Sequence, residues 1–523
     1  MGLRGERFLT GIAVALLGGC APHGFPVPEE ATVERGVLGL PVPSGIPASR
    51  PAVAVVDLDH DGAPELLFGS DDGFPTLFSN HGDGTFSLAT PDVPPPHPDR
   101  ERFSVGLAVV DLTGDHLPDI VVSGLGFVSA YENLGGLKFG PPVRLYAETS
   151  FPMRIFPQPT FGDMDGDHDL DLALPAVELS ALDGDGGPTT FPLLRNDDGH
   201  FTVIRHLDLH GERGLSLLGA FTDRDRDGDL DLLIASDRAG AGFPSTAMWR
   251  NDGVDAEGNA ILVEDSAEVG VDLPWSGMGI ATADLNTDGL PDYFIADIGG
   301  NDCIVSEGGG WVESAAALGL EPDLDDPSQW FGWSSHLEDL DNDGHLDALA
   351  VGGQADLLLF PDLELPPDAE HQPNQLWQGT PEGDFVPAEP GEFGSALHDY
   401  AAAVGDLEGD GVLEVVVTDA TGVPRIYDML GVTGSALTIR LHGPPENTLA
   451  IGTLVSWEAG DRSGLLEVQG PRSFGQSSPT LHVGLGDLAG VDRVTAHWPG
   501  GETTTVENVH ATALLALTHP RAF

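Results

Sequence analysis

Short apolar runs of three or four residues alternate with polar turns along most of the chain. Val53–Val56 and Leu66–Phe68 flank one such turn, and Ile120–Val122 and Val415–Val417 follow two others. Runs of this length, bounded by Gly, Asp and Asn, are typical of β-strands. The 70 glycines and 42 prolines fit a chain with many tight turns. The pattern therefore predicts an all-β protein built from hairpins.

The polar turns are copies of one motif. Aspartates recur at alternate positions in seven places, whose first residues are separated by 54, 52, 60, 61, 55 and 67 positions. Each copy carries oxygen-bearing side chains at positions 1, 3, 5 and 9. The seven sets are Asp57, Asp59, Asp61 and Glu65; Asp111, Thr113, Asp115 and Asp119; Asp163, Asp165, Asp167 and Asp171; Asp223, Asp225, Asp227 and Asp231; Asp284, Asn286, Asp288 and Asp292; Asp339, Asp341, Asp343 and Asp347; and Asp406, Glu408, Asp410 and Glu414.

This spacing suits a hard cation of the size of calcium. Oxygen ligands at positions 1, 3, 5 and 9, with a backbone carbonyl near position 7, can wrap Ca²⁺, and glycine at position 6 allows the sharp turn. Asp-rich turns without metal are the alternative, and it weighs most at the second copy, where Thr113 replaces a carboxylate. Magnesium prefers fewer protein ligands and keeps its waters. We therefore expect up to seven calcium ions.

The motif is not an EF-hand. An EF-hand loop needs a bidentate Glu at position 12, and here every residue at that position is apolar. These residues are Phe68, Val122, Leu174, Ile234, Ile295, Ala350 and Val417. Each loop instead joins two strands of a hairpin, and about 55 residues per copy leave room for two more strands. The repeat predicts a seven-bladed β-propeller over residues 32–430.

Two further features resemble a known repeat. Asn80 to Phe86 and Asn196 to Phe201 place a glycine turn before an aromatic residue, and residues 277–289 read Gly-Met-Gly-Ile-Ala-Thr-Ala-Asp-Leu-Asn-Thr-Asp-Gly. Together with the aspartate loops, these segments resemble the FG-GAP (or VCBS) repeats of the integrin α-subunit propeller. The resemblance implies the same propeller fold with calcium in its loops.

Residues 434–518 lack aspartate loops and predict a small β-sandwich-like domain. Strands are expected at Leu437–Leu441, Leu465–Val468, Arg493–His497 and Ala513–Leu517. Four stretches resemble the ASPIC/UnbV domain: Ala450–Thr453, Ser473–Ser478, His482–Gly486 and His497–Gly501. A propeller followed by this domain is similar to the cartilage acidic protein family and its bacterial relatives. The EGF-like module of the animal members is missing here, and the resemblance implies no agreed activity for the ASPIC/UnbV domain.

The N-terminus predicts export and tethering. Residues 1–20 combine a basic start, an apolar run from Phe8 to Leu17 and small residues before Cys20, and Leu17–Cys20 resembles the bacterial lipobox. We expect a lipid on Cys20 and a lipoprotein at the outer membrane or cell surface. A location on the periplasmic face of the membrane is an alternative. An ordinary signal peptide with an incidental cysteine is the alternative. Residues 21–31 carry three prolines and read as a tether. Cys303 is expected to be a buried small residue.

The charge balance excludes one class of partner. With 84 acidic and 22 basic residues, the formal net charge is −62, so DNA, RNA and anionic lipid are repelled. We expect membrane attachment only through the lipid.

Histidines and tryptophans near the loops leave open readings. His60, His116, His168 and His345 lie inside loops and read as turn residues. Trp275, Trp330 and Trp333 either pack between blades or line a ligand face. His336 either serves a central site or is a structural histidine.

The sequence favours a binding protein over an enzyme. It contains no Gly-x-Ser-x-Gly, no His-Glu-x-x-His and no phosphate loop. We expect a calcium-stabilised surface protein that presents a propeller face to a protein or glycan partner, with no catalytic residue assigned. An enzyme with a site in the central channel is the alternative. We further expect the ring to be closed by residues 32–36 pairing with residues 424–428, because an outer strand is missing from the last blade.

Overall fold

The structure is a computed structural model of the whole chain. It describes residues 25–37, 52–70, 73–94, 104–148, 154–178, 190–209, 215–237, 246–322, 324, 330–353, 372–395, 399–419, 424–511 and 514–522. Cys20 and the expected signal peptide lie outside these residues. No helix within the described ranges is long and apolar enough to cross a membrane.

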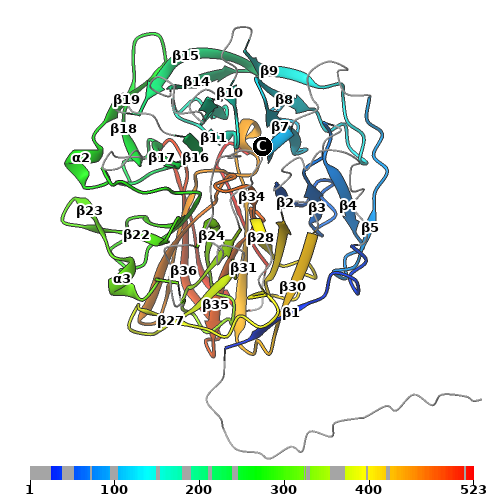
Figure 1. Ribbon diagram of the computed structural model, residues 1–523, viewed down its shortest axis with the longest axis vertical. Helices are drawn as coiled ribbons and strands as arrows, with labels where there is room; N and C mark the ends of the chain where they lie inside the picture. The colour runs from blue at the N-terminus through cyan, green and yellow to red at the C-terminus, as the bar shows by residue number, and fades with distance from the viewer. Residues whose placement is uncertain are drawn as a thin grey trace, which may run out of the picture.

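Within the described part of residues 27–430, seven sets of four antiparallel strands follow one another and are arranged around a common centre (Figure 1); the first set gains a fifth, parallel strand from the C-terminal region. From first to last strand they contain β2 (Val53–Val56), β3 (Glu65–Phe68), β4 (Thr76–Asn80) and β5 (Phe86–Leu88); β6 (Ser104–Val110), β7 (Asp119–Gly124), β8 (Phe127–Tyr131) and β9 (Val143–Ala147); β11 (Thr160–Gly162), β12 (Asp171–Ala173), β14 (Thr190–Asp197) and β15 (His200–Asp208); β16 (Leu215–Thr222), β17 (Asp231–Asp237), β18 (Ala247–Val254) and β19 (Ala260–Glu264); β20 (Gly279–Ala283), β21 (Asp292–Asp297), β22 (Gly300–Glu307) and β23 (Gly310–Glu313); β24 (Gly332–Glu338), β25 (Asp347–Gly352), β26 (Gln375–Gly379) and β27 (Phe385–Pro387); and β28 (Asp399–Gly405), β29 (Glu414–Asp419), β30 (Pro424–Leu430) and β1 (Val27–Glu30). A two-stranded sheet of β10 (Arg154–Ile155) and β13 (Val177–Glu178) is added to them.

The first strand of each sheet lies at the centre of the ring. β16, β20, β24, β28 and β2 contact one another in that order, and β2 also contacts β6. The inner two strands are buried along their length, as in β2 and β7, whereas the fourth strands β5 and β9 are partly exposed. Continuous apolar runs therefore form the inner strands because neighbouring sheets cover both of their faces. This confirms the predicted all-β, propeller-like architecture.

The chain closes its own ring, but with different residues from those expected. β1 pairs antiparallel with β30, from Val27 opposite Leu430 to Glu30 opposite Tyr427. Residues 32–36 form a turn instead of a strand. The predicted pairing of 32–36 with 424–428 is therefore wrong in its residues, although its principle holds. Part of the segment assigned to the tether, 27–30, is the closing strand.

The closing strand lies earlier in the sequence than predicted because Gly36 is the glycine that ends the turn after it. Gly270 and Gly319 end the short helices α2 (Ser266–Val269) and α3 (Ala315–Leu318) with φ values of 84° and 82°. Gly36 has φ 85° and ends the equivalent turn. β1 ends at Glu30, six residues before Gly36, and β23 ends at Glu313, six residues before Gly319. By letter, Leu38–Leu40 matches Leu318–Leu320, and a prediction made from that match places the strand too late.

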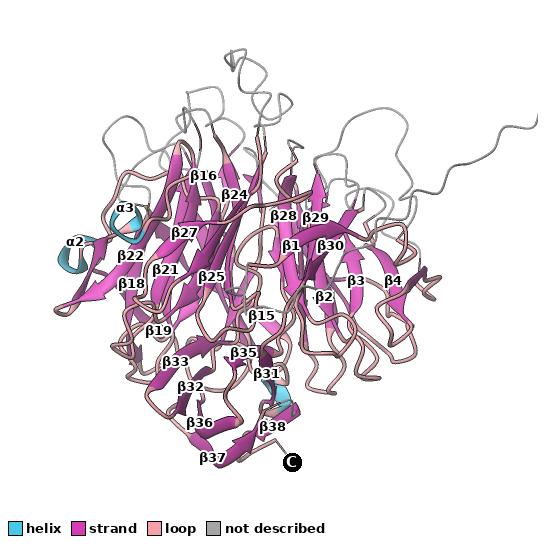
Figure 2. Ribbon diagram, turned by 90° about the horizontal axis from the view of Figure 1, so that it is seen from below, coloured by secondary structure: helices cyan, strands magenta, loops and turns pink. Residues whose placement is uncertain are grey.

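The C-terminal residues fold into two sheets packed face to face. One contains β35 (Leu481–Gly486), β31 (Ser435–His442) and β38 (Leu514–Thr518), and the other contains β33 (Arg462–Glu467), β32 (Leu454–Ala459), β36 (Gly490–His497) and β37 (Thr503–His510). A short 3₁₀ helix, η3 (Pro445–Asn447), precedes β32. Residues such as Leu437, Val455 and Val494 are completely buried in a separate core. The predicted sandwich-like domain is confirmed, and it lies against one face of the ring (Figure 2).

Candidate functional site

All seven aspartate loops share one internal hydrogen-bond pattern. In the sixth loop, Asp339 accepts the N–H of Gly344 and Asp343 accepts that of His345, each at 2.8 Å. Asp347 accepts the N–H of Leu340, also at 2.8 Å. The same three bonds, from positions 6, 7 and 2 to positions 1, 5 and 9, recur in the other six loops. The backbone therefore fixes the first, fifth and ninth carboxylates of every loop.

The turn at position 6 is left-handed in every loop. Five loops place glycine there, with φ values such as 96° at Gly62 and 91° at Gly344. The second and third loops place His116 and His168 there, at 72° and 84°. The predicted turn role of glycine is thus confirmed, and these two histidines adopt the same strained conformation.

Four loops bring three carboxylates together. The ligand atoms within each group lie within 4.8 Å of one another. The groups are Asp57, Asp59 and Asp61; Asp163, Asp165 and Asp171; Asp223, Asp225 and Asp231; and Asp339, Asp341 and Asp347. In the second and fifth loops Thr113 and Asn286 replace carboxylates, and in the seventh loop Arg35 binds Glu408. Asp111, Asp115, Asp119, Asp284, Asp288, Asp292, Asp406, Asp410 and Glu414 still lie in those loops as expected, but they form no such trio within the described chain.

The four groups fit a hard cation. Asp57, Asp165 and Asp223 each hold one buried Oδ1 without a hydrogen-bond partner in the structure. Burial, followed by the charges of Asp167 and Asp165, raises the pKa of Asp163 to about 8. Burial, followed by the charges of Asp227 and Asp225, raises the pKa of Asp223 to about 7. These unpartnered oxygens would coordinate a bound Ca²⁺, and its charge would offset the repulsion between the carboxylates.

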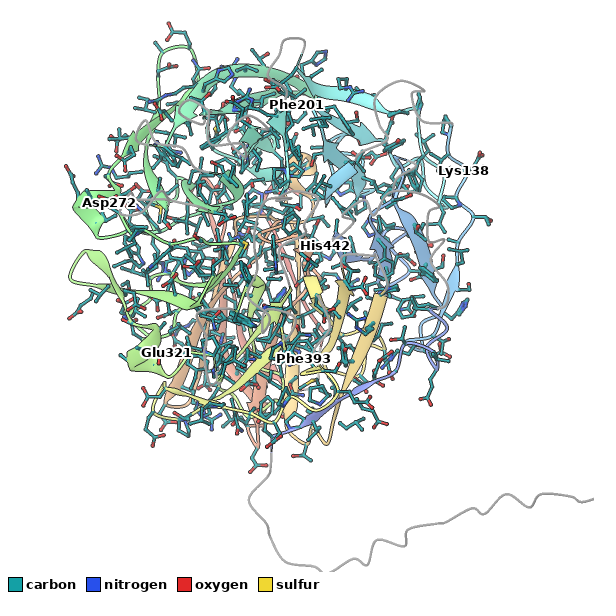
Figure 3. The ribbon with its side chains drawn as sticks, in the orientation of Figure 1. Lys138, Phe201, Asp272, Glu321, Phe393 and His442 are labelled. Carbon is teal, nitrogen blue, oxygen red and sulfur yellow. The ribbon has the colours of Figure 1, made fainter. Side chains whose placement is uncertain are left out.

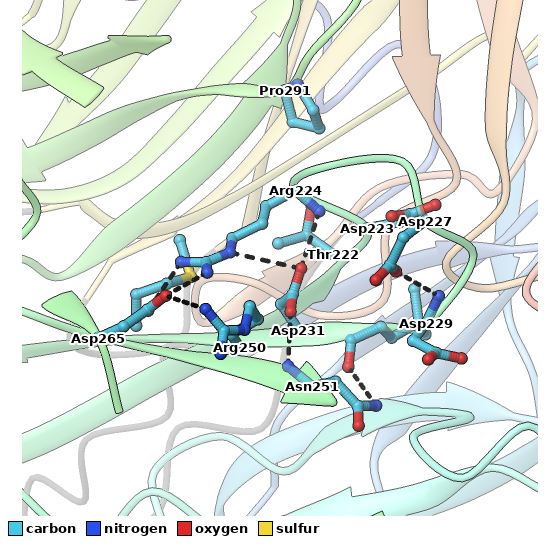
Figure 4. A network of polar contacts seen from close by, with 12 residues as sticks. Thr222, Asp223, Arg224, Asp227, Asp229, Asp231, Arg250, Asn251, Asp265 and Pro291 are labelled. Carbon is cyan, nitrogen blue, oxygen red and sulfur yellow. Dashed lines mark hydrogen bonds and ion pairs between the residues drawn. The ribbon is translucent and has the colours of Figure 1, made fainter. Parts of the chain in front are cut away.

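The fourth loop shows how the protein supports its carboxylates (Figure 4). Arg224, at position 2, donates to Asp265 at 2.9 Å and lies 3.6 Å from Asp231. The N–H of Asn251 donates to the other oxygen of Asp231 at 2.7 Å. Both oxygens of the position-9 carboxylate are therefore held before any ion binds.

An asparagine at the end of the third strand ties neighbouring blades together. The Asn133 side chain donates to the carbonyl of Leu58 in the preceding loop at 3.0 Å and to that of Pro118 in its own loop at 3.1 Å. Asn80 and Asn251 make the equivalent pairs of bonds. Sequence reasoning placed Asn80 in a hairpin turn and missed this role. The recurring Asn before the Gly turn was the available signal.

Arg35 occupies the seventh loop. Its guanidinium binds Glu408, donates to Asp428 at 2.8 Å and lies 3.6 Å from Glu414. Arg35 belongs to the turn that follows the closing strand, so ring closure and the seventh loop share one residue. A fixed positive charge already faces two of the four carboxylates there.

The C-terminal domain covers the loop face through His482–Gly486 and His497–Gly501, two of the four stretches that stood out in the sequence. His482 donates to the Asn342 side chain, and the Gly500 N–H donates to the carbonyl of Gly228 at 3.0 Å. Arg226 donates to His497 at 3.1 Å. Gly484 leaves no room for a Cβ against the carboxylate of Asp339. These stretches therefore dock the domain onto the loops.

The stretch 472–478 enters the centre of the ring. Gly475 and Gln476 form β34, which pairs in parallel with Val53 and Ala54 of β2. The Gln476 side chain both donates to and accepts from the backbone of Val109 in β6, at 2.8 and 2.7 Å. We call residues 472–478 the plug.

Further contacts fasten the plug to the other inner strands. Arg472 donates to the carbonyl of Phe221 in β16 at 2.7 Å, and its own carbonyl accepts the N–H of Ile280 in β20 at 3.1 Å. Ser473 and Ser478 bond to Ser334 in β24 and Val404 in β28. The plug thus contacts the first strand of six sheets.

The three tryptophans and His336, which the sequence left as either packing or ligand-binding residues, contact the surrounding protein. Trp330 and Trp333 are buried and donate to the carbonyls of Pro373 and Gly353, and Trp275 is buried in the same way. His336 contacts the plug and the carbonyl of Ala402, and burial lowers its pKa to about 4. Cys303 is completely buried, as expected.

Two family descriptions match this chain. The FG-GAP-like repeat matches residues 57–122, 111–174 and 223–295, and the ASPIC and UnbV domain matches residues 443–522. Comparison with curated proteins found no match.

Among solved structures, BBS1N in complex with ARL6DN, soaked with mercury, is 12% identical with a TM-score of 0.44, covering 74% of this chain and 94% of that chain. The same complex soaked with lead gives 12% and 0.43, with the same coverage. An Agrocybe aegerita lectin that recognises non-reducing terminal N-acetylglucosamine gives 16% and 0.40, covering 66% and 80%.

Proposed function

The chain is a protein of FG-GAP-like repeats that ends in an ASPIC and UnbV domain, and we propose that it is a calcium-stabilised, lipid-anchored binding protein outside the cytoplasm. Its partner would be a protein or a glycan. The occupied centre of the ring is the observation that carries this proposal. Because the plug bonds to the inner strands of six sheets, a substrate cannot use the part of the channel that the plug fills. This counts against the alternative of an enzyme with a site there.

The preformed carboxylate groups support the calcium part of the proposal. A site with a Kd of about 10 μM would stabilise the folded protein by about 2.7 kcal/mol in about 1 mM calcium. Several filled sites would together match the whole stability of an ordinary domain, about 5–15 kcal/mol. We expect the melting temperature to fall markedly when EGTA replaces calcium. A change of no more than a degree or two would contradict the calcium role.

The anchor rests on the N-terminal sequence. Cys20 follows an apolar run and two glycines, which suits lipidation after cleavage. Cys20→Ser should move the protein from the membrane fraction to the soluble fraction of cells. Cys303→Ser serves as the matched control, because that thiol is buried in the fifth sheet. Equal fractionation of Cys20→Ser and the native chain would exclude the anchor.

The binding role is tested by capturing partners with the mature, metal-loaded protein. A specific partner should be retained in calcium and lost in EGTA. The exposed Lys138 is the only lysine and lies at the rim of the ring (Figure 3), so coupling through its amine leaves the domain boundary accessible. Turnover of a captured small molecule, without stable retention of it, would favour the enzyme alternative.

A further inference from the structure

A cavity of about 840 Å³ lies between the ring and the C-terminal domain. Its lining includes the first and seventh loops on one side and β31 on the other. Cavities of roughly 300–1,000 Å³ at domain boundaries are the usual size and place of small-molecule sites. The volume is therefore sufficient for a sugar of one or two rings.

The wall contributed by β31 is polar by virtue of strand alternation. Leu437 and Ile439 point into the core of the C-terminal domain, and Leu441 contacts both that core and the cavity. Thr438 and Arg440, on the opposite face, line the cavity together with His442. His442 lies near the centre of the ring in the view of Figure 3. This wall offers a guanidinium, an imidazole and a hydroxyl.

The wall contributed by the loops offers oxygen acceptors. Asp57 and Asp406, the first residues of their loops, line the cavity, and Asp57 keeps a buried Oδ1 without a partner. Two of the three carboxylates in the first loop's group are exposed, whereas two of three are buried in the third and sixth loops. Arg440 lies 3.8 Å from Asp57, which is too far for a hydrogen bond. The first loop is thus the group that opens most towards a ligand.

The combination of walls selects the chemistry of the ligand. A purely anionic molecule would face the carboxylates, a cationic one would face Arg440, and an apolar one would bury both without partners. A hydroxyl both donates and accepts, so a molecule with many hydroxyls satisfies both walls at once. Pro64 and Leu413 add apolar surface for the carbon face of a ring.

We propose that this cavity binds a saccharide, held by Thr438, Arg440 and His442 on one side and by the first loop on the other. The inference rests on the proposed binding function and names the class of partner. Calcium in the first loop would add to this wall a cation that hydroxyl oxygens can ligate.

A glycan array probed with protein labelled at Lys138 tests the inference. In millimolar calcium we expect retention on a subset of glycans, at least tenfold weaker for Arg440→Gln and for Thr438→Val. Arg493→Gln is the matched control, because Arg493 is exposed, pairs with Glu458 and lies outside the cavity. Thermal melts and calcium counts of each variant verify that fold and metal content are unchanged.

Three outcomes overturn the assignment. If the native protein binds no glycan, a saccharide ligand is excluded. The proposed function is then tested separately by the melting experiment in EGTA and by the partner capture. Equal binding by the native protein and the Arg440→Gln and Thr438→Val variants would place a glycan site elsewhere on the molecule. Binding unaffected by EGTA, with calcium removal verified, would exclude the first loop from the site.

Discussion

Arg472 offers the sharpest test of how the two domains are joined. It is 5% exposed, and its guanidinium lies 2.8 Å from Glu467, which is 4% exposed. It also donates to the carbonyl of Phe221 and to the hydroxyl of Thr282 in two neighbouring blades. Arg472→Met keeps the aliphatic stem but leaves the Glu467 carboxylate buried with only Thr222 as a hydrogen-bond partner, at 3.4 Å.

The expected loss is large because it breaks a buried ion pair. Removing one partner of such a pair costs about 3–5 kcal/mol. An unfolding entropy of about 2.1 cal/mol/K per residue, over roughly 500 residues, gives about 1 kcal/mol/K. If the two domains unfold together, the melting temperature should fall by about 3–5 °C. Calorimetry in saturating calcium measures this shift.

A second variant separates the charge effect from simple loss of contacts. Arg472→Met combined with Glu467→Gln removes the unpaired charge and should recover more than half of the loss. Burial already raises the pKa of Glu467, so the single variant should also be less affected in mild acid, where the carboxyl takes up a proton. A single variant that loses less than about 1 kcal/mol, or a double variant no more stable than the single one, would refute the reasoning.

Three further outcomes follow from the loops and the ring closure. Asp343→Ala should remove one calcium and leave the others, because blades contact mainly their neighbours; native mass spectrometry counts the ions, and loss of all of them at once would contradict independent loops. In EGTA, stability should fall as the pH rises from about 5 to 9. The folded pKa values of Glu65 and Glu414, about 8 and 9, lie above the ordinary 4.5, so the native state binds protons that the unfolded chain has released. Denaturant titrations across that range check the sign, and calcium should flatten the slope. Deleting residues 27–37 should lower the melting temperature sharply by removing β1, whereas deleting 21–24, which spares the core-packed Phe25 and the buried Pro26, should change it little; equal effects would show that the closing strand carries no stability.

The sequence predicted the repeats well because each loop encodes its own geometry. Alternating aspartates with a residue that tolerates positive φ at position 6 fix the hairpin locally, and all seven hairpins formed where expected. Closure of the ring by an N-terminal strand was predicted correctly because the last blade lacked a fourth strand. The residues of the closing strand were predicted wrongly because Leu38-Gly39-Leu40 has the same letters as Leu318-Gly319-Leu320. The residue that shares the conformation of Gly319 is Gly36.

Contacts between distant segments could not be read from the chain. Nothing local in Ser473–Ser478 shows that it enters the ring, because its partners are distant in the sequence. Val109 lies 367 residues before Gln476, and even Val404 lies 74 residues before Ser478. The cavity was missed for the same reason: His60 was interpreted as a turn residue, and Arg440 attracted no notice on a strand. Both the plug and the cavity arise only where the two domains meet.

The ring is fastened at two radii, by β1 at its outer edge and by the plug at its centre. Release of either one leaves the other in place, so the first and last sheets remain connected until both have been released. Such a requirement raises the barrier to unfolding more than it raises the equilibrium stability, provided that both contacts form late in folding. A chain held in this way should unfold slowly for its equilibrium stability, because a contact that is lost at one radius can re-form while the other still holds.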